Sequence, residues 1–190
     1  MATASTLARV GTPGPRVRLG TTATGYLMIA GVLFAGEFLF IYSGLAWTGA
    51  SRMVVFVYLA PCLTALGLHW FLPSERLSSL QWSGVLLAFA GVAIAFADGF
   101  ASDRASLLGD AFGVIAAALW AATTVVIRTS GLNRISASKT LFYQLAVAAA
   151  ALPVASVLLG EPGVVALTPL VVASLLYQGG IVAFARYLAW

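Results

Sequence analysis

Charged side chains are scarce in this sequence: 10 are basic and 6 are acidic, which together make up 8% of its 190 residues. A soluble domain carries roughly a quarter charged residues, so this chain cannot coat a globular surface with charge. Its one cysteine, Cys62, excludes an internal disulfide and a metal site built from cysteines. Its one histidine, His69, leaves zinc without a usual set of ligands. We therefore expect neither a metal nor a cofactor.

Enzyme chemistry inside a membrane would also lack its usual residues. The sequence offers no cluster of histidines or cysteines, and its acids are widely separated. General acid and base catalysis needs such groups within hydrogen-bonding reach of one another and of the substrate. We therefore expect a protein that is not an enzyme.

Hydrophobic residues are plentiful instead, at 61%, and they fall in six long runs. Each run is near the roughly 20 residues that a helix needs to cross about 30 Å of hydrocarbon. A backbone in lipid must satisfy its own hydrogen bonds, so the runs predict helices rather than strands. The predicted fold class is all-α, a polytopic membrane helix bundle with six transmembrane helices. The runs are Gly25–Trp47, Met53–Phe71, Leu80–Ala97, Leu108–Ile127, Thr140–Leu159 and Leu170–Trp190.

Residues 1–24 are polar and broken by proline and glycine, which predicts a flexible N-terminal tail. Their arginines, serines and threonines without an acid also resemble a transit peptide, an alternative that stays open. Basic residues gather on one side of the predicted bundle, which the positive-inside rule makes cytoplasmic. We therefore expect a multi-pass protein of the cell inner membrane with both termini cytoplasmic, in contact with the lipid bilayer and not with nucleic acid. The cytoplasmic side holds Arg9, Arg16, Arg18, Arg76, Arg128, Arg134 and Lys139, and the other side holds Arg52 and Arg104.

Glu37 lies at the centre of the first run, in LFAGEFLFIYSGLAW, with no basic residue near it in sequence. A charged side chain at bilayer depth costs roughly 2.5–3.5 kcal/mol on insertion scales, and such residues usually line a pathway or relay protons. Glu37 is therefore a candidate for a proton or substrate site. The alternative is a neutral Glu37 that joins two helices through a hydrogen bond.

Three other positions carry a structural or a functional interpretation. Pro61 interrupts the second run, where it predicts a kink that is either a pocket wall or hinge, or simply tolerated. Trp120 lies well inside the fourth run and is either a pocket residue or a packed side chain. Asp110, at the start of that run, is interpreted as an N-terminal helix cap. Ridges of small residues predict close helix packing: Gly109, Gly113, Ala117 and Ala121 in the fourth run, and Gly84, Ala88 and Gly91 in the third.

The first and last hydrophobic runs have similar sequences when they are aligned at their final tryptophans. GVLFAGEFLFIYSGLAW, residues 31–47, aligns with SLLYQGGIVAFARYLAW, residues 174–190. The first and sixth of six helices cross in opposite directions, which is typical of an inverted-topology repeat in secondary transporters. The alignment places Gly180 opposite Glu37, so only one copy carries the carboxylate. A repeat in this frame predicts a ten-helix parent fold of which the chain holds the middle six.

Five stretches follow one another along the chain: EFLFIYSGLAWTGASRMVVFVYLAPCLTALG, SERLSSLQWSGVLLAFAGVAIAF, LGDAFGVIAAALWAATTVVIR, KTLFYQL and LLYQGGIVAFARYLAW. In this order and spacing they resemble helices three to eight of the EamA-type branch of the drug/metabolite transporter superfamily. The resemblance implies a ten-helix inverted-repeat transporter fold. Residues 25–97 would end the first repeat, 98–107 would link the repeats and 108–190 would open the second. Four family helices have no counterpart, which leaves open a truncated, non-transporting membrane protein that is inactive without them.

The resemblance and the position of Glu37 together predict a secondary transporter, a permease or exporter of a small organic metabolite or drug. Transport would be proton-coupled and follow alternating access around a site near the membrane midplane. The expected partners are the bilayer and a small-molecule substrate, with protons and a second copy of the chain left open. The predicted substrate and proton pathway comprises Glu37, Tyr42, Ser43, Pro61, Thr64, Trp120, Tyr177 and Gln178.

Overall fold

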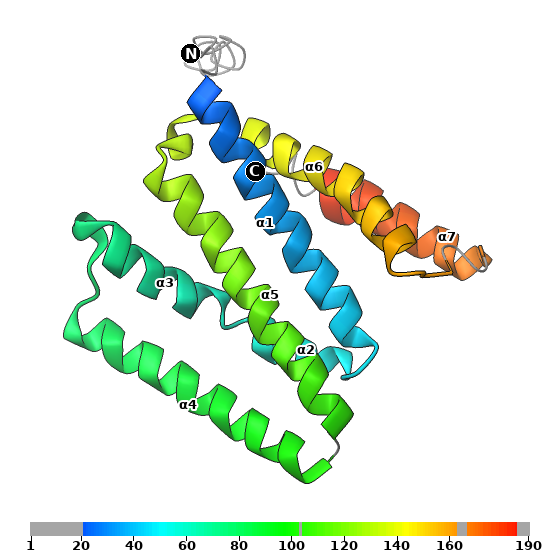
Figure 1. The fold of residues 1–190 in the computed structure, drawn as a ribbon, viewed down its shortest axis with the longest axis horizontal. Helices are drawn as coiled ribbons and strands as arrows, with labels where there is room; N and C mark the ends of the chain where they lie inside the picture. Colours follow the sequence, from blue (N-terminus) through cyan, green and yellow to red (C-terminus); the bar gives the residue numbers. More distant parts are fainter. Residues whose placement is uncertain (1–20, 103, 163–166, 186–190) are drawn as a thin grey trace, which may run out of the picture. The chain divides into compact units, whose positions relative to one another are not determined.

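The computed structural model describes residues 21–102, 104–162 and 167–185 (Figure 1). In these ranges every regular element is a helix and there is no strand, which confirms the predicted all-α fold class. Residues 1–20 of the predicted tail and residues 186–190 of the sixth predicted run lie outside the described residues.

The chain divides into two compact units, Met1–Leu152 and Pro153–Trp190, and helix α6 begins in the first and ends in the second. The first unit contains α1 (Thr21–Leu45), α2 (Ala50–Val57), α3 (Ala60–Phe71), α4 (Ser79–Ser102), α5 (Arg104–Thr129) and the larger part of α6 (Ala137–Leu158). Two short 3₁₀ turns, η2 (Pro73–Glu75) and η3 (Leu132–Arg134), join its helices. The second unit continues with α7 (Pro169–Leu176) and the wider π-helix η4 (Tyr177–Ala185).

Four helical segments are long and apolar enough to cross a membrane, and they match the first, second, fourth and fifth predicted spans. The third predicted span lies in α4, and the sixth begins in α7 and continues into η4. The apolar stretch described in each of these places is shorter than a membrane crossing, at 10–17 residues. The polytopic membrane bundle is therefore confirmed, and a full crossing by the third and sixth spans stays a prediction. The four long segments are Thr21–Leu45, Ala50–Phe71, Ser106–Thr129 and Ala137–Leu158, and the shorter ones are Ser79–Ile94 and Pro169–Ile181.

The second predicted span is broken rather than kinked. Helix α2 ends at Val57, and α3 begins at Ala60 with Pro61 in its first turn. A proline there loses nothing, because the first N–H groups of a helix have no intrahelical acceptor. Pro61 also has no N–H to donate to the carbonyl of Val57, the bond that would carry an α-helix across the break.

Helix α5 is the centre of the first unit, because α1, α2, α3 and α4 all pack on it (Figure 1). The predicted ridge of small residues on α5 makes this contact. A Cβ on Gly109 would lie 2.7 Å from the Cβ of Thr48, and one on Gly113 would lie 2.8 Å from the Cβ of Phe56. Ala117 is fully buried in a cluster with Leu59, which directly precedes α3, and Ala60 of α3. The prediction that this ridge packs closely is confirmed.

The two glycines of the second predicted ridge, on α4, do not pack on the rest of the unit. A Cβ added to Gly84 or Gly91 would meet nothing within 4 Å. The reason is the face that α4 turns to its neighbours. Val85 is buried and Val92 packs against the cluster of Ala117, and Gly84 and Gly91 lie about 80–120° around the helix from these valines.

Candidate functional site

Glu37 is buried in α1, with 5% of its surface exposed. Ala30 and Gly44, about two helical turns before and after Glu37, lie within about 20° of it around the helix. Both are buried as well. A Cβ on Gly44 would lie 3.0 Å from the Cβ of Phe112 and 3.2 Å from the backbone oxygen of Gly109, both on α5. The face of α1 that carries Glu37 is therefore the face that packs on α5.

The register of the two helices gives the depth of Glu37. Gly44 lies against Gly109, and the ring centroids of Phe40 and Phe112 are 5.5 Å apart. Nearer the start of α1, a Cβ on Gly36 would lie 3.3 Å from Leu119. The helices therefore run antiparallel. Interpolation along the register places Glu37 at the level of two fully buried α5 residues, Ala116 and Ala117.

The break between α2 and α3 lies at the same depth. Val57 packs with Ala116, and Ala60 packs with Ala117. The carbonyl of Val57, to which Pro61 cannot donate a hydrogen bond, is thus near the level of the Glu37 carboxyl. No hydrogen bond or ion pair joins Glu37 to another side chain among the described residues. A buried acid and an interrupted helix share one layer of the bundle.

The other predicted residues of α1 do not share the face of Glu37. Tyr42 lies about 140° from it around the helix and Ser43 about 120°. Tyr42 is 62% exposed, and its ring extends a row of aromatic side chains in which the Phe38 centroid lies 6.2 Å away. Phe38 in turn lies 4.9 Å from Phe34. Tyr42 and Ser43 are therefore close to Glu37 in the sequence, but their side chains leave α1 on a different face of the helix.

Three more predicted residues come from α3 and α5. Pro61 is exposed and Thr64 is half-buried, one turn further along α3. Trp120 is 40% exposed. It follows Ala116 by one turn on α5, about 40° around the helix, so it lies one turn from the level of Glu37. The first unit thus brings the Pro61 break to the depth of Glu37 and Trp120 within one turn of it.

Tyr177 and Gln178 belong to the second unit, in the first turn of η4. Tyr177 is 57% exposed. The side-chain amide of Gln178 donates a hydrogen bond of 3.3 Å to the hydroxyl of Ser174 on α7. Their part in the pathway stays a prediction.

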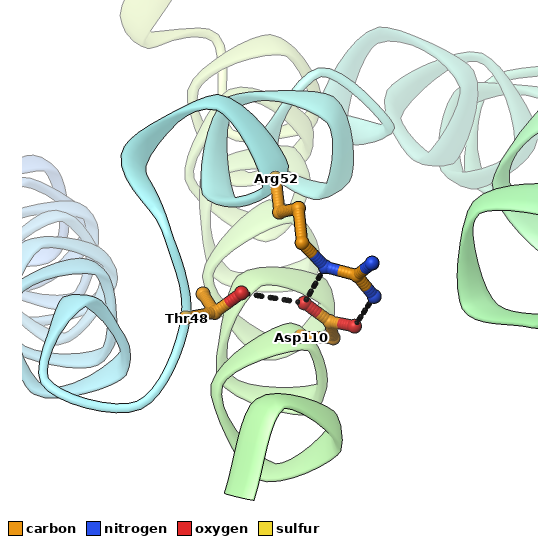
Figure 2. Close-up of polar contacts among 3 residues, drawn as sticks. All are labelled: Thr48, Arg52 and Asp110. Carbon is orange, nitrogen blue, oxygen red and sulfur yellow. Dashed lines mark hydrogen bonds and ion pairs between the residues drawn. The ribbon is translucent and has the colours of Figure 1, made fainter. Parts of the chain in front are cut away.

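Sequence reasoning did not predict the polar cluster around a second buried acid, Asp110. Its side chain is fully buried and lies more than one turn inside α5, which begins at Arg104, so the N-cap interpretation is wrong. Figure 2 shows its partners: the Thr48 hydroxyl donates to one carboxylate oxygen over 2.9 Å, and Nε of Arg52 donates to the same oxygen over 3.2 Å. Nη2 of Arg52 binds the other carboxylate oxygen.

This cluster of Thr48, Arg52 and Asp110 ties the α1–α2 connection to α5. A bidentate arginine–carboxylate pair is the strong form of this interaction, and both oxygens of Asp110 are occupied by donors. A usable signal was present in the sequence, because Arg52 and Asp110 stand at span ends on the same predicted side of the membrane. Asp110 is thus engaged in holding helices together, whereas Glu37 has no side-chain partner among the described residues.

Polar contacts also close the opposite end of the first unit. Arg128, near the end of α5, forms an ion pair with Glu75 of η2. Nδ1 of His69 accepts a hydrogen bond of 2.9 Å from the backbone N–H of Leu77. These contacts fix the α3–α4 connection against the end of α5.

Comparison with known families gives one match. Residues 6–97 match the model of the EamA-like transporter family. The match begins inside the predicted tail and ends at Ala97, where the first predicted repeat ends. No curated protein and no solved structure matches the chain.

Proposed function

Because the chain carries an EamA-like transporter domain at residues 6–97 and has several membrane-length apolar helices, we propose that it is a secondary transporter of a small organic metabolite or drug. Transport is coupled to protons and proceeds by alternating access. The chain lies in the cell inner membrane with both termini in the cytoplasm. Glu37 is the group that binds and releases the proton.

The observation that carries this proposal is the burial of Glu37 without a partner. An acid inside a membrane bundle is costly and usually serves a pathway or a proton relay. Where this bundle uses an acid to join helices, at Asp110, two residues donate hydrogen bonds to its carboxylate. Glu37 is 5% exposed and no side-chain partner is present among the described residues, which supports a role other than joining helices.

The α2–α3 break supplies the second element of the mechanism. Carbonyls freed at membrane depth are tolerated where they face protein or a wet cavity, and broken helices of this kind form the central sites of secondary transporters. Since the break and Glu37 share one level, we place the proposed solute site at that level. Movement of α3 relative to α2 about this break would then alter access to the carboxyl. Tyr42, Ser43, Thr64, Trp120, Tyr177 and Gln178 remain the other proposed pathway residues.

Transport by reconstituted protein tests the proposal. Proteoliposomes with an imposed proton gradient are given ethidium, as a drug-like cation, or radiolabelled amino acids, as metabolites. The unaltered chain should accumulate or extrude one probe only while the gradient persists. Glu37→Gln keeps the size of the side chain and removes the titratable proton, so gradient-driven transport should fall by about a hundredfold or more, the lower end of what an acid–base group contributes.

Two variants serve as controls. Glu161→Gln removes an exposed carboxyl from the second unit and should leave transport unchanged. Glu37→Asp keeps a carboxyl and should retain part of the coupling. Gradient-driven transport that is equal in Glu37→Gln and the unaltered chain would refute Glu37 as the coupling group, and absence of transport for both probes by folded protein would contradict transport of these solute classes.

Stability separates a coupling role from a structural one. If Glu37 joined two helices, Glu37→Leu would destabilise the bundle by the loss of a hydrogen bond, on average about 0.6 kcal/mol in membrane proteins. If Glu37 is an unpartnered acid, the same change removes a costly group and should leave the free energy of unfolding unchanged or raise it. Detergent unfolding curves of the two proteins give the answer.

A further inference from the structure

A pocket of about 300 Å³ lies where the end of α5, the turn η3 and the start of α6 meet, well away from Glu37 along α1 and α5. Its walls are mainly apolar, with three polar side chains among them. A volume at the lower end of known ligand pockets suits a small group or part of a larger molecule. The lining residues are Ile127, Leu132, Asn133, Ile135, Ala137, Thr140, Leu141 and Gln144.

Gln144 is the unusual member of this lining. It is only 7% exposed, and its amide has no hydrogen-bond partner among the described residues. A side-chain amide brings two donors and one acceptor, and burying them unpaired costs stability. One turn earlier on α6, Thr140 is 6% exposed and makes only a long 3.5 Å contact with the backbone oxygen of Ser136. The pocket thus presents one amide, that of Gln144, which no described residue binds, beside the weakly bonded hydroxyl of Thr140.

Two cations are next to lining residues in the sequence. Arg134 follows the lining residue Asn133, and Lys139 precedes Thr140. Among the described residues no carboxylate pairs with either of them, whereas nearby Arg128 is paired with Glu75. The residues next to the lining in the sequence therefore carry an excess of positive charge, at the end of the membrane helices that also carries Arg76.

We propose that this pocket binds an anionic phospholipid of the cytoplasmic leaflet. The phosphate accepts hydrogen bonds from the amides of Gln144 and Asn133, Arg134 and Lys139 neutralise its charge, and the glycerol and first acyl carbons lie against Ile127, Leu132 and Ile135. Basic pockets between membrane helices on the cytoplasmic side select such headgroups. A free phosphate would leave the apolar walls without a contact, so a lipid fits the whole lining better.

Native mass spectrometry of the full chain in detergent, titrated with phosphatidylglycerol or with phosphatidylcholine of the same acyl chains, measures the binding. The unaltered chain should retain phosphatidylglycerol preferentially. Arg134→Gln with Lys139→Gln should weaken its binding by roughly tenfold or more, since each basic residue near a membrane surface contributes about fivefold. Gln144→Leu should weaken it by about two- to tenfold, the effect of one hydrogen bond.

Arg76→Gln is the matched control, because it removes a positive charge from the same end but lies outside the pocket. Its lipid affinity should match that of the unaltered chain, and circular dichroism should show equal helix content in all variants. Equal retention of the two lipids would overturn the proposal, as would unchanged binding in both pocket variants. Displacement of phosphatidylglycerol by inorganic phosphate alone would overturn it in favour of a phosphate site, and displacement by a transported solute would assign the pocket to the transport path.

Discussion

Removing one member of the Arg52–Asp110 pair should be more harmful than removing the other. Asp110 is fully buried, whereas the Arg52 side chain is 30% exposed. If Arg52 is lost, the carboxylate stays buried with only Thr48 as a donor. If the charge of Asp110 is lost, the guanidinium can turn to water. The unequal exposure of the two partners therefore predicts unequal costs.

The magnitudes follow from the burial of each group. Arg52→Met leaves an uncompensated buried charge, which costs about 3–5 kcal/mol of unfolding free energy. Asp110→Asn keeps an acceptor for Thr48 and loses charge-assisted hydrogen bonds, at about 1.5–3 kcal/mol. The double variant carries no buried charge, so it should be more stable than Arg52→Met alone. Arg52 takes part in one further interaction, but both proteins in that last comparison lack it.

Reversible unfolding in mixed micelles, followed by far-ultraviolet circular dichroism, measures the three free energies. The expected order of destabilisation is Arg52→Met, then the double variant or Asp110→Asn. The reasoning fails if Asp110→Asn is the most harmful single change. It also fails if the costs of the two single changes simply add in the double variant, because the pair would then not be coupled.

Three further changes test packing and surface charge. Gly109→Ala should destabilise by about 1–3 kcal/mol, because its Cβ would lie 2.8 Å from the backbone nitrogen of Thr48; Gly84→Ala, with nothing within 4 Å, should gain about 0.5–1 kcal/mol of helix stability. Equal effects at the two glycines in thermal unfolding would contradict the packing described for α5 and α4. Glu75→Gln should cost under about 1 kcal/mol, since the Glu75 and Arg128 side chains are 32% and 44% exposed and solvent screens them; a larger loss in the same assay would contradict the screening of this ion pair by solvent.

Sequence reasoning succeeded where the physical signal is local. Apolar runs of membrane length predicted the helices, since a backbone in lipid has few alternatives. The small residues of α5 predicted the close packing found along that helix, and Pro61 marked the place where the second span is interrupted. Each of these follows from residue types within a few turns of one another.

It failed where the decisive partner is distant in the chain. Asp110 near a helix start resembles a cap, and only the folded structure brings Thr48 and Arg52, 62 and 58 positions away, onto its oxygens. The ridge on α4 failed for a related reason. Spacing shows that Gly84 and Gly91 share a face, but it does not show which face of a helix meets a neighbour.

The contrast between the two buried acids sharpens the assignment of Glu37. Both lie in the interface of α1 or its following turn with α5, and both are under 6% exposed. Asp110, at the end of the interface, has three donor contacts from two residues. Glu37, at the level of Ala116 and the α2–α3 break, has none among the described residues. Because no described side chain occupies the Glu37 carboxyl, this group is available to bind and release a proton or a solute. Transport requires such reversible binding.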